Sequence, residues 1–409
     1  MLCQFSVKNF RCIKDEITLD MQAADIDEKK DSLLIDSDEE KFLPLAVIYG
    51  PNGGGKSTIL DAIYSLCTKI MRPILAANND ELKNESFNSE IQPYRFDEES
   101  EKECTDFEIF FRTSKYEYQY CLSVFKMDII DESLYHKRIG GRQYTKIFSR
   151  NKNEAIQLKG SLKEYSAKGI SETLSLLSYL AITHLENAVI KDVIEWFRKQ
   201  VVFLDYKRSD MEQYKYMGIS DDSNIKPMII NMLQGMGIDI TDYHIEKTKD
   251  PELIKIYTIH EINGKKYQLN LHDESSGTIK IFNIIPFIIE ALSKGCTLIV
   301  DELDAKLHPL LLQYIIQLFN DSSLNKNKGQ LIFTSQDVIT MTEDNFRRDE
   351  IWFAAKNVED VTQVYSLVEF KENQQNDSKK DISYQESYME GRYGADPFLR
   401  KLVEWRVES

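Results

Sequence analysis

The chain has 409 residues, of which 42% are hydrophobic and 29% are charged, and its formal net charge at pH 7 is −16. These values are typical of a globular protein with one large domain or two ordinary ones. They exclude a disordered chain. The most apolar stretch is too short and too polar for a transmembrane helix, so we expect no membrane partner.

The six cysteines are scattered, and the amino terminus lacks the pattern of a signal peptide. Isolated thiols in apolar segments indicate a reducing cytoplasm, and they predict neither a disulfide framework nor a zinc site. An acidic chain is a poor general binder of nucleic-acid backbones, because that affinity comes mainly from Lys and Arg. Nucleic acid is therefore not supported as a partner by the charge.

The first part of the chain alternates between strand and helix patterns. Residues 3–20 predict two short strands around a polar turn, and the acidic residues 24–40 predict a surface loop. The apolar residues 43–49 predict a buried strand, and residues 57–71 have the apolar spacing of a helix. Residues 106–113 and 116–126 alternate again, which predicts antiparallel strands.

The later part predicts helices over residues 161–200, with an interruption at "KGISE". The stretch "LIKIYTIHEINGKKYQLNLHDE" predicts a hairpin with Asn263 and Gly264 in a type I′ turn. A helix is expected from Gly277 to about Lys294, followed by the strands "TLIVDE", "QLIFTSQ" and "EIWFAA". No heptad pattern is present, which argues against a long coiled coil.

A phosphate-binding loop follows the first buried strand. In "YGPNGGGKST" the residues Gly50, Gly55, Lys56 and Ser57 fit the pattern G-x-x-x-x-G-K-[ST]. Glycines let backbone N–H groups turn toward phosphates, Lys56 would neutralise the β and γ oxygens, and the Ser57 hydroxyl would ligate Mg²⁺. The loop thus predicts ATP and Mg²⁺ as cofactors, with nucleotide contacts from Asn52, Gly53, Gly55, Lys56, Ser57 and Thr58.

A second motif, "CTLIVDELDAKLHP", has an apolar strand that ends in two carboxylates. Asp301 is placed to hold Mg²⁺ through water. Glu302 is placed to polarise the attacking water as a catalytic residue, which suits phosphoryl transfer. An apolar run ending in Asp-Glu is common alone, but its pairing with the loop is specific.

The segment "DESSGTIKIF" discriminates between classes of nucleotide-binding protein. Ser275, Ser276 and Gly277 stand at the start of a helix, with Gly277 placed 24 residues before Asp301. GTPases and helicases have no such element, whereas ABC-type ATPases keep a signature motif there that caps the γ-phosphate held by another subunit. The alternative is an ordinary serine N-cap. The position relative to Asp301 favours the signature motif.

Two further residues follow the ABC order of motifs. Asp304 occupies the place of a dimer-contacting D-loop residue. Gln336 stands where a switch histidine is usual and is the third catalytic candidate, beside Glu302 and Lys56. Glutamine can donate a hydrogen bond to a γ-phosphate but cannot become positively charged, so hydrolysis is expected to be slow or differently regulated.

The motifs together resemble a known family. The opening "FSVKNFRCIKDE" is similar to the start of SMC/RecF-like ABC ATPases. The set "YGPNGGGKST", "PYRFD", "DESSGT", "VDELDAKLHP", "RRDEIWF" and "YMEGRYGADPF" resembles the AAA15-type ATPases grouped with AbiL and RloA, over residues 3–398. This resemblance implies an ATP-driven homodimer or higher oligomer. It also implies a role in bacterial anti-phage defence beside a separately encoded effector, a nuclease or toxin.

The expected fold is α/β: an ABC-type (SMC/RecF-like) P-loop ATPase head with an antiparallel β lobe, an inserted helical segment and no long coiled coil. Residues 1–150 would form the N-terminal half of the head, with the Walker A loop and the β lobe. Residues 151–250 would form the helical lobe. Residues 251–409 would supply the signature, Walker B, D-loop and switch motifs.

Several assignments stay open on the sequence. The Q-loop glutamine is Gln92 or Gln200, and Arg392 either reaches a partner or nucleotide or belongs to a capped helix end. The leading function is an ATPase that senses and regulates an effector. A RecF-like DNA-repair or DNA-binding ATPase is the main alternative, and a non-hydrolysing, ATP-bound scaffold that sequesters a toxin is the third.

Overall fold

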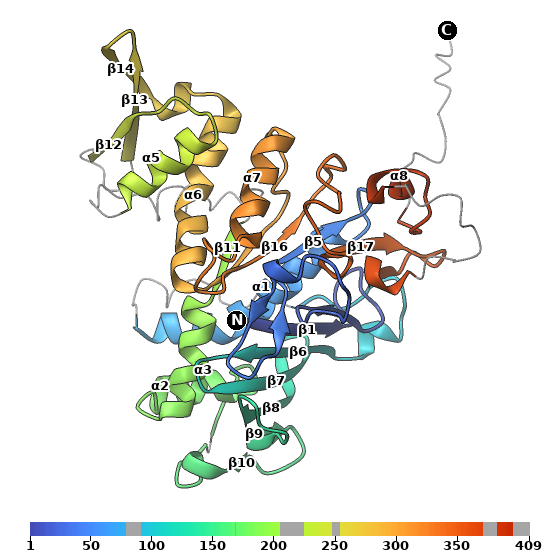
Figure 1. Cartoon of the computed structure of the whole chain (residues 1–409). Coiled ribbons are helices and arrows are strands. Elements are labelled where there is room, and N and C mark those ends of the chain that lie inside the picture. The colour runs from blue at the N-terminus through green and yellow to red at the C-terminus, as the bar shows by residue number, and fades with distance from the viewer. Residues whose placement is uncertain (79–90, 168, 205–224, 248–253, 371–382, 396–409) are drawn as a thin grey trace, which may run out of the picture.

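The computed structural model describes the chain except for residues 79–90, 168, 205–224, 248–253, 371–382 and 396–409. Its centre is a six-stranded sheet in which neighbouring strands are parallel, apart from the antiparallel pair at one edge (Figure 1). Strands buried on both faces read as continuous apolar runs. In spatial order they are β11 (Val201–Leu204), β15 (Thr297–Val300), β16 (Gln330–Thr334), β5 (Leu45–Tyr49), β17 (Ile351–Lys356) and β18 (Thr362–Ser366).

Helices cover both faces of this sheet. Alternate residues of β5 point to opposite sides, so Ala46 and Ile48 belong to one hydrophobic core and Leu45 and Val47 to another. The first core contains α1 (Lys56–Asn78), α2 (Leu176–Thr183) and α3 (Ala188–Lys199). The second contains α5 (Lys226–Gly235), α6 (Ser276–Lys294), α7 (Pro309–Asn320) and α8 (Tyr384–Met389).

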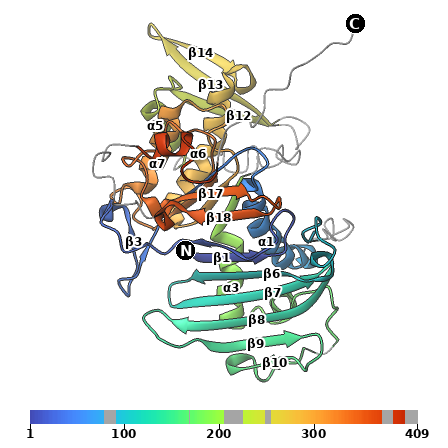
Figure 2. The same ribbon diagram turned by 90° about the vertical axis from the view of Figure 1, so that its right-hand side faces the viewer.

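An antiparallel sheet of seven strands shares the first core. It lies below the central sheet in Figures 1 and 2 and presents alternate residues, such as Phe107 and Ile109, to that core. The predicted antiparallel β lobe is therefore confirmed. Its strands in spatial order are β10 (Gln157–Leu158), β9 (Thr145–Asn151), β8 (Asp128–Arg138), β7 (Tyr116–Phe125), β6 (Thr105–Arg112), β1 (Leu2–Lys8) and β2 (Ile17–Asp20).

A third sheet projects from the molecule beside α5 and α6, at the top of Figure 2. It consists of β12 (Asp242–Lys247), β13 (Ile254–Ile262) and β14 (Lys265–Asn270). The predicted hairpin is β13–β14. Asn263 and Gly264 have φ angles of 52° and 73°, the left-handed values that a type I′ turn requires at both central positions. A further pair joins β3 (Leu34–Ile35), which lies within the predicted surface loop of residues 24–40, to β4 (Lys41–Phe42), which follows it.

The interval 151–250 does not form one helical body in the described residues. Its first strands complete the antiparallel sheet, α2 and α3 pack in the first core, and β11 pairs with β15 in the central sheet. α5 and β12 lie at the other end of the molecule, against the second core. The domain boundaries, with residues 151–250 as an inserted helical lobe, stay a prediction.

The helices after the phosphate loop and after Gly277 are found as α1 and α6. Within the described ranges, no helix is longer than the 23 residues of α1, in line with the expected lack of a long coiled coil. By length and composition α6 alone of the described helices could cross a membrane, but 56% of its apolar segment is buried. Ile281, Ile284 and Ile288 of α6 lie in the second core, so the helix has the pattern of a core helix.

The motif "RRDE" fastens the loop before β3 to the start of β17. The Arg347 side chain is fully buried, donates to both carboxylate oxygens of Asp349 at 2.9 and 2.7 Å, and also donates to the carbonyl oxygens of Ala24 and Glu28. Arg348 pairs with the Glu28 carboxylate at 2.6 Å. This motif therefore acts in packing.

The last residue of the motif, Glu350, is fully buried. One of its carboxyl oxygens accepts the N–H of Arg347 at 2.9 Å, and the other has no hydrogen-bond partner among the described residues. Burial, with the nearby Asp349 charge, raises the pKa of Glu350 to about 8. The raised pKa means that the stability this group contributes is complete below its unfolded-state pKa and is lost as the pH rises toward 8.

Replacement Glu350→Gln tests this reasoning. Between pH 6 and pH 9 the wild-type free energy of unfolding should fall by roughly 2 kcal/mol more than that of the variant, because only the wild type must ionise a buried carboxyl. Urea denaturation at both pH values measures the difference. Glu359→Gln, at an exposed turn, is the control and should follow the wild type. Parallel pH profiles for wild type and Glu350→Gln would contradict the assignment.

Candidate nucleotide-binding site

The phosphate-binding loop leaves β5 and enters α1, and it lies directly against β17 and β18. A Cβ atom at Gly50, whose φ is 148°, would lie 2.0 Å from the carbonyl oxygen of Ala354. A Cβ atom at Gly55, whose φ is 105°, would lie 2.6 Å from the side chain of Thr362. The glycines are therefore required by close backbone approach as well as by conformation.

Lys56 lies inside this loop. Its side chain is buried and donates to the carbonyl oxygens of Gly50 at 2.7 Å and of Pro51 at 3.1 Å. The ammonium group is thus positioned by the loop whose N–H groups would contact phosphates. Asn52 and Gly53, at the tip of the loop, are exposed. Thr58 accepts a hydrogen bond from the thiol of Cys12 at 3.2 Å.

Three oxygen-bearing side chains meet beside the loop. The hydroxyl of Ser57 donates to Oδ1 of Asp301 at 3.0 Å, and the hydroxyl of Thr334 donates to the same oxygen at 2.6 Å. Asp301 is only 8% exposed. Hydroxyl and carboxylate oxygens are ligands suited to Mg²⁺, so the donor set fits the predicted cation.

Glu302 follows Asp301 in an unusual conformation. Its φ of 50° places a non-glycine residue in the left-handed region. Its backbone N–H donates to the Thr334 hydroxyl at 2.7 Å, so that hydroxyl both donates to Asp301 and accepts from Glu302. Thr334, which the sequence analysis missed, therefore fixes both Walker B carboxylate residues.

The D-loop and switch residues are joined directly. Oδ2 of Asp304 accepts the backbone N–H of Gln336 at 3.0 Å. Burial raises the pKa of Asp304, although this hydrogen bond opposes the rise. The Gln336 side chain is exposed. Asp304 and Gln336 are thus neighbours in the structure. The contacts of Asp304 with a partner chain and of Gln336 with nucleotide stay predictions.

The signature residues begin α6. Ser275 is an N-cap whose hydroxyl accepts the N–H of Thr278 at 3.1 Å, so the ordinary capping role is realised. Ser275 and Ser276 are both exposed. The preceding Glu274 accepts a hydrogen bond from Thr258 of β13 at 2.6 Å and lies 2.7 Å from Nε2 of His260. The three-stranded sheet is therefore tied to the signature turn.

Lys280, another residue that the sequence analysis missed, also lies in α6. It donates to carbonyl oxygens in the loop after Asp301, including that of Leu303 at 2.8 Å. No sequence pattern marks such a contact, because its acceptors are backbone atoms. The only available signal was a lysine within an apolar helix face.

The two Q-loop candidates lie at opposite ends of the central sheet. The carbonyl of Gln200 accepts the N–H of Thr297 at 2.8 Å, at the amino ends of β11 and β15. The carbonyl of Gln92 accepts the N–H of Arg11 at 2.9 Å, and the Arg11 side chain pairs with Asp61 of α1. Ligands of parallel sheets bind at the carboxyl ends of strands, so Gln92 is the better placed candidate.

The position of Arg392 does not support a contact with a partner or with nucleotide. Its side chain pairs with Glu390 at 2.6 Å. The neighbouring Tyr393 ring stacks on Phe353 with centroids 5.1 Å apart, and its carbonyl accepts the hydroxyl of Tyr365 at 2.5 Å. The described part of "GRYGADPF" therefore packs against β17 and β18, and its last three residues lie outside the described ranges.

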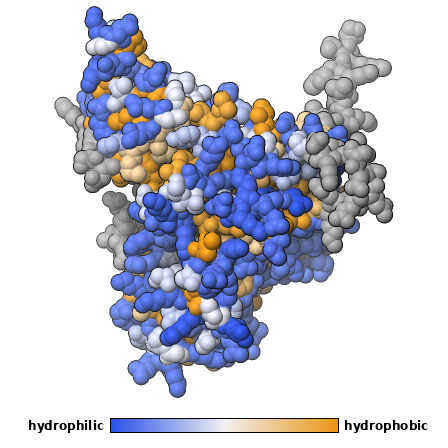
Figure 3. All heavy atoms as spheres, in the orientation of Figure 1, coloured by the Kyte–Doolittle hydropathy of each residue, from blue (hydrophilic) through white to orange (hydrophobic). Residues whose placement is uncertain are grey.

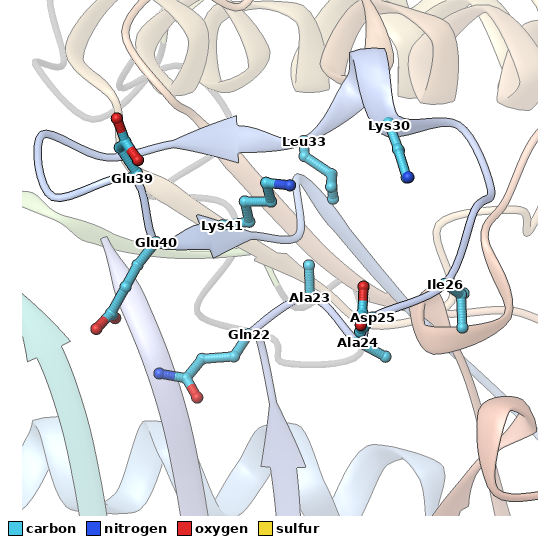
Figure 4. A pocket seen from close by; sticks show the side chains of 10 residues that line it. All are labelled: Gln22, Ala23, Ala24, Asp25, Ile26, Lys30, Leu33, Glu39, Glu40 and Lys41. Carbon is cyan, nitrogen blue, oxygen red and sulfur yellow. The ribbon is translucent and has the colours of Figure 1, made fainter.

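A cavity of about 370 Å³ lies away from these residues. Figure 4 shows its lining around residues 22–26 and the β3–β4 hairpin, with lysines and carboxylates interspersed. None of its lining residues belongs to the phosphate loop or to the signature turn. The mixed charges are those of an open polar surface, so this cavity is not the nucleotide site.

Comparison with protein families gives one match. The model described as "AAA domain, putative AbiEii toxin, Type IV TA system" matches residues 45–342, which is more than half of the chain. The chain belongs to this AAA-domain family. The match begins at β5 and runs past Gln336, so it includes every site residue discussed above except those of the amino-terminal turn and the carboxyl end. No curated protein matches the chain.

Solved structures of SMC heads are distantly similar. The SMC head bound to the C-winged helix domain of ScpA has 12% identity and a TM-score of 0.45, covering 89% of this chain and 97% of that chain. The SMC head of Thermotoga maritima has 13% identity and a TM-score of 0.42, covering 89% and 98%. The head with an extended coiled coil bound to ScpA, derived from Pyrococcus furiosus, has 12% identity and a TM-score of 0.39, covering 89% and 96%.

Thr334→Val tests the arrangement around Asp301. The variant removes the hydroxyl that orients Asp301 and takes the Thr334 acceptor from the part-buried Glu302 N–H, so the free energy of unfolding should fall by about 1–3 kcal/mol. The Mg²⁺ concentration needed for half-maximal nucleotide binding should rise about 10-fold, as is typical for the loss of a group that orients a metal ligand. Titration with a fluorescent ATP analogue measures it. Thr334→Ser keeps the hydroxyl and is the control, and unchanged Mg²⁺ dependence in Thr334→Val would contradict the role.

Proposed function

We propose that this AAA-domain protein binds ATP with Mg²⁺ and hydrolyses it to ADP and phosphate. The observation that carries the proposal is the 3.0 Å contact between the Ser57 hydroxyl and the Asp301 carboxylate, with Glu302 next in the chain. This contact brings the phosphate loop and the end of β15 to one point at the carboxyl edge of the sheet.

The residues divide the chemistry among themselves. The loop N–H groups and Lys56 bind and neutralise the phosphates, and Ser57 and Asp301 would hold Mg²⁺, the latter through water. When bound, the cation neutralises charge on the β- and γ-phosphate oxygens. Glu302 polarises the attacking water, and the exposed Gln336 can donate a hydrogen bond to the γ-phosphate but cannot carry positive charge, so turnover is slow.

We also propose that two chains close on two ATP molecules. The exposed Ser276 and the half-buried Gly277 lie at the same edge of the sheet as the phosphate loop, because α6 ends at the amino end of β15. Leu310 and Ile339, which follow the carboxyl ends of β15 and β16, are 66% and 59% exposed. Figure 3 shows apolar side chains over the upper ends of α6 and α7. A second copy would cover them in a symmetric interface.

The biological role proposed is that of a cytoplasmic sensor. ATP-driven closure would hold or release a separately encoded effector in anti-phage defence, as the AbiL and RloA resemblance implies. The family description, with its putative toxin and type IV toxin–antitoxin system, fits such a role. Purification of the tagged chain from its host, with and without ATP, would identify a stoichiometric effector.

Two alternatives have distinct signatures. A RecF-like DNA ATPase would bind DNA in a salt-dependent manner that ATP stimulates, which the net charge of −16 does not favour. A scaffold that only binds ATP and sequesters a toxin would release no phosphate. Phosphate release that Glu302→Gln abolishes removes this second alternative.

Glu302→Gln should trap the ATP-bound dimer. The amide keeps the size of the side chain but cannot polarise water, so hydrolysis should fall by at least about 100-fold while ATP still closes the interface. Light scattering with excess ATP and Mg²⁺ measures the mass. Lys56→Ala is the control, because it should prevent both nucleotide binding and dimerisation. A Glu302→Gln chain that stays monomeric under these conditions would overturn the sandwich mechanism.

Two exposed leucines offer a matched test of the interface. Leu310→Asp places a charge at the edge that carries the phosphate loop, and a carboxylate at the start of α7 is compatible with the helix dipole. Leu324 is 53% exposed and lies just before the amino end of β16, so Leu324→Asp is the control. In the Glu302→Gln background, Leu310→Asp should weaken ATP-dependent dimerisation by at least about 10-fold and Leu324→Asp should not. Equal effects would place the interface elsewhere.

A further inference from the structure

Lys280 of α6 is held by the loop that carries Glu302. Its side chain is 7% exposed, and Nζ donates to the carbonyl oxygens of Glu302 at 2.8 Å, Leu303 at 2.8 Å and Ala305 at 2.7 Å. An ammonium group has three N–H donors, and here each has a carbonyl acceptor. One side chain thus fixes three peptide groups on both sides of the D-loop residue Asp304.

A second contact joins the same two segments. A Cβ atom at Gly277 would lie 3.0 Å from the carbonyl oxygen of Lys306, which is tighter than ordinary van der Waals contact. Gly277 and Lys280 lie three residues apart, on neighbouring positions of the helix surface. The first turn of α6 therefore touches the loop of residues 302–306 at both ends.

This loop has a constrained backbone. Glu302 and Lys306, which bound it, have φ angles of 50° and 65°. Two non-glycine residues in the left-handed region are retained only where the surroundings enforce them. The Lys280 ammonium supplies that enforcement, since three of the five carbonyl groups in the loop are its acceptors.

The chemistry of Lys280 argues against a purely space-filling role. Burial lowers the pKa of Lys280 to about 8, although the Asp304 and Glu302 charges oppose this and Lys306 adds to it. A buried cation is costly, and an apolar side chain of similar volume often serves a core equally well. A methionine would fill the same space, but it could not bind the three carbonyl oxygens.

We propose that Lys280 is a positioning residue that couples the signature turn of each chain to the Glu302 loop of the same chain. The inference rests on the proposed sandwich. There the signature turn faces ATP held by the second copy, whereas Glu302 faces the ATP held by its own chain. Lys280 then links the two nucleotide sites, so that engagement of one ATP sets Glu302 for hydrolysis of the other.

Lys280→Met tests the proposal. Its kcat for ATP hydrolysis should fall about 10- to 100-fold, because Glu302 loses its position, while the affinity of the phosphate loop for a fluorescent ATP analogue stays within about 2-fold. Lys280→Arg keeps the charge and should recover part of kcat. The rate of Lys280→Arg should also persist above pH 8, where that of the wild type declines. Lys294→Met, at the exposed far end of α6, is the control and should match the wild type.

Hydrogen exchange separates this proposal from the proposed function. In the wild type, ATP with Mg²⁺ should slow amide exchange in residues 274–280 and also in residues 302–307. In Lys280→Met the slowing should stay confined to residues 274–280. If the wild type releases no phosphate, the proposed hydrolysis fails, but the exchange pattern still decides the coupling. The coupling is overturned if ATP slows exchange in residues 302–307 equally in the wild type and in Lys280→Met, or not at all in the wild type. An unchanged kcat in Lys280→Met also overturns it.

Discussion

One carboxylate oxygen joins parts of this molecule that lie far apart in its sequence. Oδ1 of Asp301, which follows β15, accepts the hydroxyl of Ser57 at the start of α1 and that of Thr334 at the end of β16. The phosphate loop connects β5 to α1, so three neighbouring parallel strands, β15, β16 and β5, lead into this contact. The oxygen is almost buried, so its partners must be present for the fold to tolerate the charge. A shift in the register of any of these strands would therefore disrupt the site, because the pairing of the strands sets the positions of the site side chains.

The phosphate loop, the β15 strand and the β13–β14 hairpin could be predicted because their signals are local. Apolar runs, glycines and the Asn263-Gly264 pair each report a conformation within a few residues. Thr334 and Lys280 could not be predicted in their roles, because their partners are a distant carboxylate and backbone carbonyl groups. The surfaces on which α2, α3 and α5 pack could not be predicted either, because helical periodicity does not say which surface a helix packs on. The four residues of β11 are also too few to identify a strand by pattern.

Three motifs that carry the narrower family resemblance pack the structure, whereas the generic motifs carry the chemistry. "RRDE" contains the buried Arg347–Asp349 pair, and "GRYGA" stacks Tyr393 on Phe353 of β17. In "PYRFD", Tyr94 donates its N–H to the side chain of Asn9, next to the turn that contains Arg11. These motifs fasten the edges of the two large sheets, so their specificity reflects packing. The chemistry lies in the generic motifs, which many nucleotide-binding proteins share.

The signature turn is held from two directions. Glu274 is bonded to Thr258 and lies beside His260 of the projecting sheet, and Lys280 is bonded to the loop that follows Asp301. Only seven residues, 274–280, separate these two attachments, and most of them form the rigid first turns of α6. A short chain of contacts therefore links the projecting sheet to the loop that carries Glu302. The same path runs in reverse, since a coupling between two sites acts equally on both.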